Sequence, residues 1–194
     1  MKKQNSVITQ TKGFTLIELL VVIAIIGVLA AVVLLAINPA ELLRRSRDST
    51  RLSDIASIRK AIDAVVAQQT GSVTLPCTAT VCLSNDPRGR RSDGTGWLGA
   101  NPAVLNLSQY LATLPIDPIN GTGSAVVTGG NGPYTYTLTA NQTLVYSFRA
   151  NNAGEYEINC LLESTQNGRM LTGDGGNDPS RFESGTAPGL LLIN

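Results

Sequence analysis

The chain has 194 residues, enough for one globular domain of ordinary size together with a membrane anchor. Its 15 Lys and Arg residues and 14 Asp and Glu residues leave a net charge of +1, so no strong field favours nucleic acid or an acidic substrate. The chain contains no histidine, which excludes Ser-His-Asp and Cys-His catalysis and zinc sites built on histidine. We therefore expect neither an enzyme nor a specific nucleic-acid site.

An apolar run lies near the start of the chain. Residues 19–37 contain no charged and no strongly polar side chain, and Gly27 is the one interruption of the apolar sequence. In helical conformation this run would span roughly 28 Å, about the thickness of the hydrocarbon core of a bilayer. It predicts a transmembrane helix over residues 14–37. Lysines in the preceding segment, residues 1–13, favour a cytoplasmic leader with the remainder of the chain outside.

Two features stand at the outer end of this run. Glu18 places a carboxylate there, and a charge inside a membrane helix costs about 2.5–3.5 kcal/mol and usually marks a site with a partner. Alternatively, Glu18 lies at the level of the lipid headgroups, where the cost is small. An ordinary secretory signal is cleaved after its apolar run, whereas the candidate cleavage point here, Gly13-Phe14, lies before it.

The segment Lys12-Gly13-Phe14-Thr15-Leu16-Ile17-Glu18 resembles the class III signal of type IV pilins and pseudopilins. The resemblance implies that a prepilin peptidase cleaves after Gly13, that the new N-terminal Phe14 is methylated, and that Glu18 is needed for filament assembly. It covers the first part of the chain. The partners that it implies are copies of the chain in a helical filament, an inner-membrane assembly platform and its ATPase.

Pro39 follows the predicted span and removes a backbone donor, while it disfavours helical geometry at Asn38. One interpretation is a kink within a single long helix that joins the membrane half to an amphipathic half over residues 38–70. The other is that Asn38 ends one helix and Pro39 opens the next.

The amphipathic half carries an apolar stripe on one face of the helix, formed by Leu52, Ile55, Ile58, Ile62 and Val65. We expect a sheet to pack on this face. The surrounding charged residues are expected on the surface, where Asp48 and Arg51 can pair. A basic cluster at residues 44–47 lies just beyond the membrane. Three interpretations remain open for this cluster: contact with lipid headgroups, contact with an acidic patch of a neighbouring subunit, or a face exposed to water.

The globular part, residues 71–194, begins with loops. Cys77 and Cys82 are expected to form a small disulfide loop, with Trp97 packed beneath these loops and a short helix over residues 103–114. The stretch Leu114-Pro115-Ile116-Asp117-Pro118 resembles a segment that major pseudopilins carry before their first strand, and Asp117 can cap a turn there.

Alternating apolar residues then predict three antiparallel strands with one buried face. These residues are Tyr134, Tyr136 and Leu138, then Leu144, Tyr146 and Phe148, then Tyr156, Ile158, Cys160 and Leu162. Cys160 lies on the apolar side of its strand and is expected to be a buried free thiol.

Oxygen-bearing residues gather in the glycine-rich tail, namely Asp174, Asn177, Asp178 and Glu183. Calcium takes about six to eight oxygen ligands, and some pseudopilins bind it in a C-terminal loop. The spacing is not that of an EF-hand and does not match the pseudopilin pattern residue by residue. Either a calcium site or an ordinary polar turn explains it; no other cofactor is expected.

Taken together, the sequence predicts an α+β fold, with an antiparallel sheet packed on the second half of a long N-terminal helix. The predicted function is a structural subunit of a type IV pilus-like filament, a pilin or major pseudopilin. It would start as a single-pass protein of the cytoplasmic membrane, with its C-terminal domain outside. The alternatives are a minor pilin that primes the filament, and a membrane-anchored binding module or adhesin.

Overall fold

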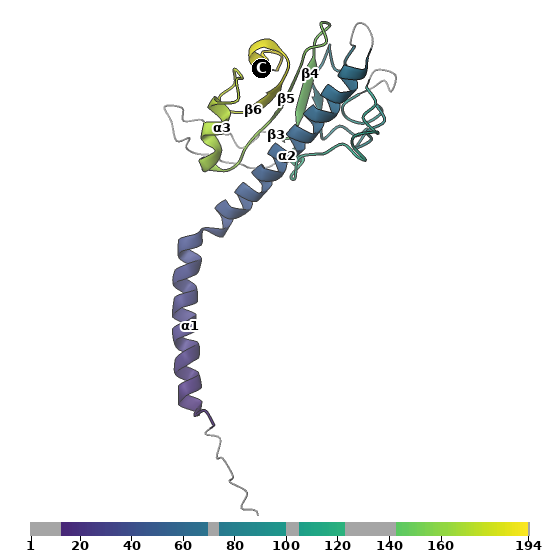
Figure 1. Cartoon of the computed structure of the whole chain (residues 1–194). Coiled ribbons are helices and arrows are strands. Elements are labelled where there is room, and N and C mark those ends of the chain that lie inside the picture. The colour runs from purple at the N-terminus through teal and green to yellow at the C-terminus, as the bar shows by residue number, and fades with distance from the viewer. Residues whose placement is uncertain (1–12, 70–73, 100–104, 123–142, 194) are drawn as a thin grey trace, which may run out of the picture. The chain divides into compact units, whose positions relative to one another are not determined.

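The computed structural model describes residues 13–69, 74–99, 105–122 and 143–193, and Figure 1 shows the arrangement of its helices and strands. The chain forms two compact units, Met1–Leu42 and Leu43–Asn194, which are described in turn. The architecture is α+β, as the sequence predicts.

Helix α1 (Leu16–Ile37) makes up most of the described part of the first unit. Its stretch Leu16–Leu34 is long and apolar enough to cross a membrane. None of that stretch is buried within the protein. The helix therefore has the length and composition that the sequence predicts for a membrane span.

Asn38 separates α1 from helix α2 (Pro39–Gln68). Its backbone is left-handed, with φ 43° and ψ 79°, a conformation that asparagine tolerates better than most residues. Its side-chain oxygen accepts a hydrogen bond from the Glu41 amide at 3.3 Å, and Pro39 occupies a first-turn position that needs no donor. Of the two interpretations that the sequence left open, the structure agrees with the second: Asn38 ends one helix and Pro39 opens the next.

The described part of the second unit contains two antiparallel sheets. The larger has the strand order β1-β4-β5-β6, formed by Cys82–Leu83, Ser147–Ala150, Tyr156–Cys160 and Phe182–Gly185. The smaller pairs β2 (Gly121–Thr122) with β3 (Thr143–Leu144). Among its described residues the unit also has three short helices: η1 (Thr165–Asn167), α3 (Gly168–Thr172) and η2 (Pro188–Leu190).

The stripe of α2 packs on the larger sheet, which confirms the prediction. Ile55, Ile58 and Ile62 are buried in one core cluster that also contains Tyr146, Phe148, Tyr156 and Ile158. Two tyrosines of the sheet also bond to the helix. The Tyr146 hydroxyl donates to Asp54 Oδ2 at 2.7 Å, and the Tyr156 hydroxyl donates to Asp63 Oδ1 at 2.5 Å. These polar bonds satisfy buried hydroxyl groups at the edges of the apolar contact.

The loops and the first predicted strands agree with the sequence only in part. Trp97 is buried, and its ring nitrogen donates to the Pro115 carbonyl at 3.0 Å, as expected of a residue beneath the loops. The short helix at residues 103–114 is wrong for its described part, residues 105–114, which forms turns. The predicted strand at residues 134–138 lies outside the described residues, and the run at 144–148 is divided between β3 and β4.

Strand β5 is buried on both faces, whereas the alternation predicts one exposed face. The C-terminal segment covers the second face, because the amides of Leu192 and Ile193 donate to Glu157 Oε2 at 2.8 and 3.0 Å. Arg149 holds the same segment by donating to the Leu192 carbonyl at 2.9 Å. The polar positions of β5 therefore bind the tail instead of water.

The three cysteines occupy two environments. Cys77 and Cys82 are joined in a disulfide with a Cα–Cα distance of 5.8 Å. Cys160 is a buried free thiol on β5, and burial raises the pKa of this thiol. A protonated, inaccessible thiol is a poor nucleophile and does not exchange readily with a disulfide.

Peptide mapping without reduction is expected to find one peptide that links Cys77 to Cys82. Cys160 should resist alkylation in the folded protein and react fully once the protein is denatured, because its low reactivity comes from burial. A peptide that links Cys160 to either of the other two cysteines would contradict this pairing and the position of Cys160 in the core.

Candidate functional site

The predicted cleavage point, Gly13-Phe14, lies just before α1, and Phe14 is 89% exposed. Among the described residues, a Cβ added at Gly13 would meet no atom within 4 Å. The described part of the fold therefore does not require glycine at this position. A molecule that binds this segment from outside would account for a requirement for a residue without a side chain.

Thr15 and Glu18 form a capping box at the start of α1. The Thr15 amide and hydroxyl both donate to Glu18 Oε2, at 2.8 and 2.7 Å, while the Glu18 amide donates to Thr15 Oγ1 at 3.3 Å. This arrangement satisfies amides that a helix start leaves without partners, and it fixes the carboxylate at the positive end of the helix dipole. Both bonds end on Oε2, so the geometry leaves Oε1 for a further donor.

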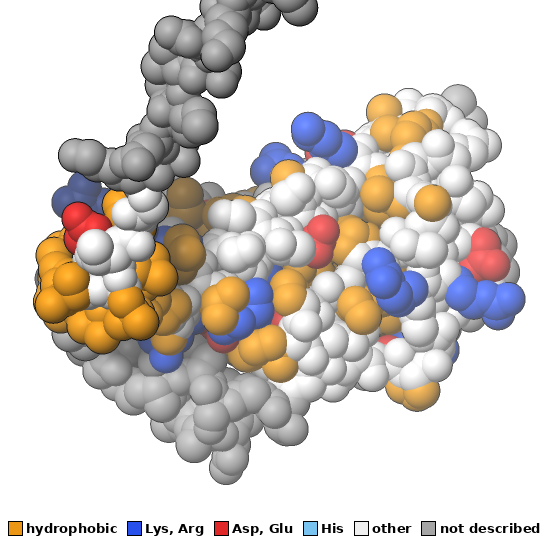
Figure 2. All heavy atoms as spheres, turned by 90° about the horizontal axis from the view of Figure 1, so that it is seen from below, with side chains coloured by type: hydrophobic (Ala, Val, Ile, Leu, Met, Phe, Trp, Pro, Cys, Tyr) orange, Lys and Arg blue, Asp and Glu red, His pale blue; other side chains and the backbone are white. Residues whose placement is uncertain are grey.

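The remaining surface of α1 is apolar on every side. Its described large apolar side chains are between 48% (Val21) and 83% (Leu16) exposed. Hydrophobic side chains surround the end of this helix in the space-filling view of Figure 2. A surface of this kind needs lipid or other apolar helices around it, because contiguous exposed apolar patches mark membrane or protein contacts.

A buried ionic network in the second unit was not predicted. Arg51 has no exposed surface and bonds to Asp117 twice, through Nε at 2.6 Å and Nη2 at 3.0 Å. Its Nη1 donates to Asp48 Oδ1 at 2.9 Å and to Glu163 Oε2 at 2.7 Å. Burial opposes the charge of Arg51, but hydrogen bonds and charges from Asp117 and Glu163 outweigh it and raise the pKa of Arg51.

This network joins three separate segments of the second unit. Asp48 accepts from the amides of Glu163 and Ser164, both at 2.8 Å, and Asp117 accepts from the amide of Ile119 at 2.8 Å. The surface pair expected between Asp48 and Arg51 is therefore buried. A signal existed in the sequence, because Arg51 lies four residues before Ile55 and so continues the buried stripe of α2.

The basic cluster at residues 44–47 is partly engaged within the chain. Arg47 donates to Glu163 through Nε at 2.6 Å and through Nη2 at 2.9 Å. Burial raises the pKa of Glu163, but bonds to Arg47 and Arg51 outweigh it and hold that pKa below its usual value. The sequence suggested lipid headgroups, a neighbouring subunit or water as partners of this cluster. Arg47 instead pairs with an acidic residue of its own chain.

The side chains of the possible calcium site already have partners within the protein, and the Asn177 amide group lies 3.3 Å from Glu183 Oε1. Asp174 and Glu183 are in contact through the backbone, since the Glu183 amide donates to Asp174 Oδ2 at 2.8 Å. Asp178 accepts from the Ser180 amide and hydroxyl at 2.8 and 2.6 Å and pairs with Arg181 at 3.5 Å. Within the described part of the chain, no three His, Cys, Asp or Glu side chains are grouped closely enough to hold a metal ion. The arrangement does not fit calcium.

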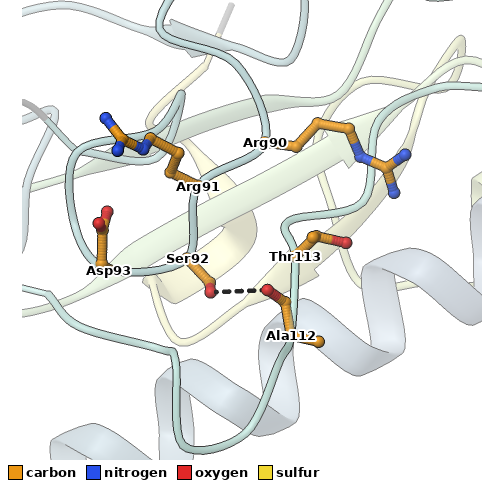
Figure 3. Close-up of a pocket in the computed structure, with 6 residues that line it drawn as sticks. All are labelled: Arg90, Arg91, Ser92, Asp93, Ala112 and Thr113. Atoms are coloured by element: carbon orange, nitrogen blue, oxygen red, sulfur yellow. Dashed lines mark hydrogen bonds between the residues drawn. The ribbon is translucent and has the colours of Figure 1, made fainter.

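A surface hollow of about 370 Å³ lies between residues 90–93 and residues 112–113 (Figure 3). Ser92 bridges its two sides by donating to the Ala112 carbonyl at 3.3 Å. The side chains of Arg90 and Arg91 extend in different directions, so their guanidinium groups do not meet at a common ligand position. The geometry gives this hollow neither a nucleophile with a base nor a convergent anion site.

An apolar helix headed by this capped carboxylate, followed by an α+β domain, defines a subunit of pilin-like filaments. Comparisons with known proteins agree. Residues 8–34 match the family model described as the prokaryotic N-terminal methylation motif. Over 137 residues the chain is 30% identical to the type II secretion system core protein G of Pseudomonas aeruginosa strain PAO1, covering 68% of this chain and 85% of that protein. No solved structure matches. The chain belongs to the type IV pilin and pseudopilin family and is a filament subunit.

Proposed function

We propose that the chain is the major structural subunit of an extracytoplasmic filament, held first in the cytoplasmic membrane by α1. The observation that carries this proposal is the surface of α1, which is apolar all round and bears a single carboxylate, Glu18. Outside the bilayer such a helix is stable when copies of itself surround it. A head-to-tail contact of this kind repeats without closing and gives a helical polymer.

Cleavage precedes assembly in this proposal. A prepilin peptidase cuts between Gly13 and Phe14, and Phe14 becomes the methylated N-terminus. The exposed position of the cleavage point and the open space at Gly13 support access by an enzyme. The cut also creates a new α-amine one helical turn from the Glu18 carboxylate.

Glu18 then sets the position of each subunit along the filament. Its Oε2 is used by its own helix, and Oε1 accepts from the Phe14 amine of the next subunit. Two charges that leave water together recover much of their desolvation cost only when their geometry is good. A subunit displaced along the apolar core would leave both charges without partners, so the pair selects one register.

The relative in Pseudomonas aeruginosa belongs by name to a type II secretion system, and we propose that this chain serves a secretion filament of the same kind. An inner-membrane platform and its ATPase extract the subunit from the bilayer. The chain carries out no reaction itself. Its contribution is polymerisation, with the α+β domain on the filament surface.

Mass spectrometry of the mature protein tests the proposed processing. The mature chain is expected to begin at N-methylated Phe14, and Gly13→Leu should leave the precursor uncut because the added side chain blocks entry to the peptidase. Gly27→Leu is the matched control, because a Cβ at Gly27 would also meet no atom within 4 Å among the described residues. That variant should be cleaved normally. A mature N-terminus at Met1, or one after Ala36, would contradict the proposal.

A further inference from the structure

The acidic residues of the C-terminal loop, residues 174–183, face backbone amides. Asp174 Oδ1 accepts from the Gly176 amide at 3.0 Å, and its Oδ2 accepts from the Glu183 amide at 2.8 Å. Glu183 Oε2 in turn accepts from the Asp178 amide at 2.8 Å. The two carboxylates thus bind the loop from both of its ends, and amide hydrogens point at oxygens that a calcium ion would otherwise share.

The loop also covers a free edge of the larger sheet. Strand β6 is the last in the order β1-β4-β5-β6, so among the described residues its outer side has no neighbouring strand in that sheet. The Glu183 amide lies on β6 and donates to the Asp174 side chain. An uncovered amide on an edge strand is a template for pairing with another chain, and here a carboxylate occupies it.

Gly176 allows the loop to approach β6 closely. A Cβ at this position would lie 1.9 Å from Glu183 Oε2 and 2.9 Å from Glu183 Cβ, so any side chain would displace Glu183. The backbone at Gly176 thus packs directly on the carboxylate that holds the loop. The contact is complete without a metal ion between the two parts.

We infer that residues 174–183 form a metal-independent clasp, in which Asp174 covers the outer amide of β6 and Glu183 holds the loop backbone against the strand. The clasp blocks the addition of a strand from a neighbouring molecule at this edge. It also takes the place of the calcium site that the resemblance to pseudopilins allows. The inference concerns the second unit and is independent of the proposed assembly mechanism.

Calcium dependence of the melting temperature is the first test. The full chain in detergent micelles is heated with millimolar calcium chloride or with a chelator, and unfolding is followed by the fluorescence of Trp97. An ion that binds only the folded state raises the melting temperature with its concentration. We expect the same melting temperature in both conditions. A saturable rise with calcium that disappears in Asp174→Asn would overturn the inference.

Two alanine variants with the same charge change form the second test. Asp174→Ala removes the acceptor of the Glu183 amide on β6. Asp178→Ala removes bonds to Ser180 and the ion pair with Arg181, but it removes no acceptor of the Glu183 amide. We expect Asp174→Ala to lower the melting temperature by roughly 3–8 °C. Hydrogen exchange at the Glu183 amide should become faster in Asp174→Ala and remain unchanged in Asp178→Ala. Equal effects of the two variants, or a Glu183 amide still protected in Asp174→Ala, would overturn the clasp.

Gly176→Ala opens the clasp without any change of charge. Because the added methyl group displaces Glu183, this variant should also speed exchange at the Glu183 amide and increase thioflavin-positive association between molecules. A Gly176→Ala protein with wild-type exchange on β6 would show that the close approach of the loop does not protect this edge.

Discussion

Replacing Glu18 by alanine is expected to abolish filament formation while membrane insertion and cleavage remain normal. Insertion becomes easier, because a charge within a membrane helix costs up to about 2.5–3.5 kcal/mol. Cleavage is unaffected, because Gly13 and Phe14 lie outside α1. Assembly fails because the Phe14 amine of the neighbouring subunit enters an apolar core without its partner. Removing one member of a buried ion pair costs about 3–5 kcal/mol, a hundredfold or more for each subunit contact.

The measurement compares the yield of sheared filaments with the amount of cleaved protein in the membrane. Glu18→Gln separates the two roles of this side chain, because its amide oxygen can still accept from Thr15 but carries no charge to pair with an amine. It should therefore keep the helix start and still fail to assemble. Thr15→Val removes the hydroxyl of the capping box and keeps the charge, so it should reduce assembly less than Glu18→Ala does. A normal filament yield from Glu18→Ala would show that Glu18 is merely an interfacial residue.

The helices were predictable because their signals are local. The apolar run of α1 and the stripe of α2 each follow from side chains a few positions apart, and Ile55, Ile58 and Ile62 are buried as that spacing indicates. The junction was not predictable to the same degree. Pro39 is compatible with a kink and with a new helix, and the choice depends on the left-handed backbone of Asn38.

The burial of the second face of β5 could not be predicted, because the segment that covers this face lies far along the chain. Glu157 alternates with apolar residues and therefore looks solvent-exposed in the sequence. The amides that bury it belong to Leu192 and Ile193, which are 35 and 36 residues further on. Alternation reports the face that a strand turns toward its main core, and it carries no information on a tail that covers the other face.

The residues of the candidate assembly site were predictable from the sequence, whereas the geometry of the C-terminal loop was not. Gly13, Phe14 and Glu18 belong to one contiguous motif. The contact of Thr15 with Glu18 was not predicted, although Thr15-x-x-Glu18 has the spacing of a capping box and would have indicated it. The residue types at 174–183 are compatible both with a calcium site and with an ordinary polar turn. The direction of the Asp174 oxygens, which face amides, is set by the approach of the loop to β6.

Replacing Arg51 by methionine is expected to destabilise the second unit strongly, because Arg51 is fully buried at the centre of the ionic network. The variant leaves the carboxylates of Asp48, Asp117 and Glu163 close together with their central counter-charge removed. Breaking a buried pair in this way costs about 3–5 kcal/mol, a large share of the roughly 5–15 kcal/mol by which a typical domain is stable. We therefore expect the melting temperature to fall by roughly 6–20 °C.

Arg59→Met on the same helix is the matched control for this prediction. Arg59 pairs with Asp63 at 3.7 Å, with both side chains 46% exposed, and donates to Ser184 Oγ at 3.0 Å. Loss of this exposed pair and one hydrogen bond should cost about 1–2 kcal/mol, less than the loss of Arg51. Thermal unfolding of the full chain in detergent micelles measures both variants. Adding Asp117→Asn to Arg51→Met should restore part of the lost stability, because it removes one of the carboxylates that Arg51 leaves unmatched. If Arg51→Met melts within a degree or two of Arg59→Met, the network does not hold the three segments together. If the second substitution lowers the melting temperature further, unmatched negative charge is not the cause of the loss.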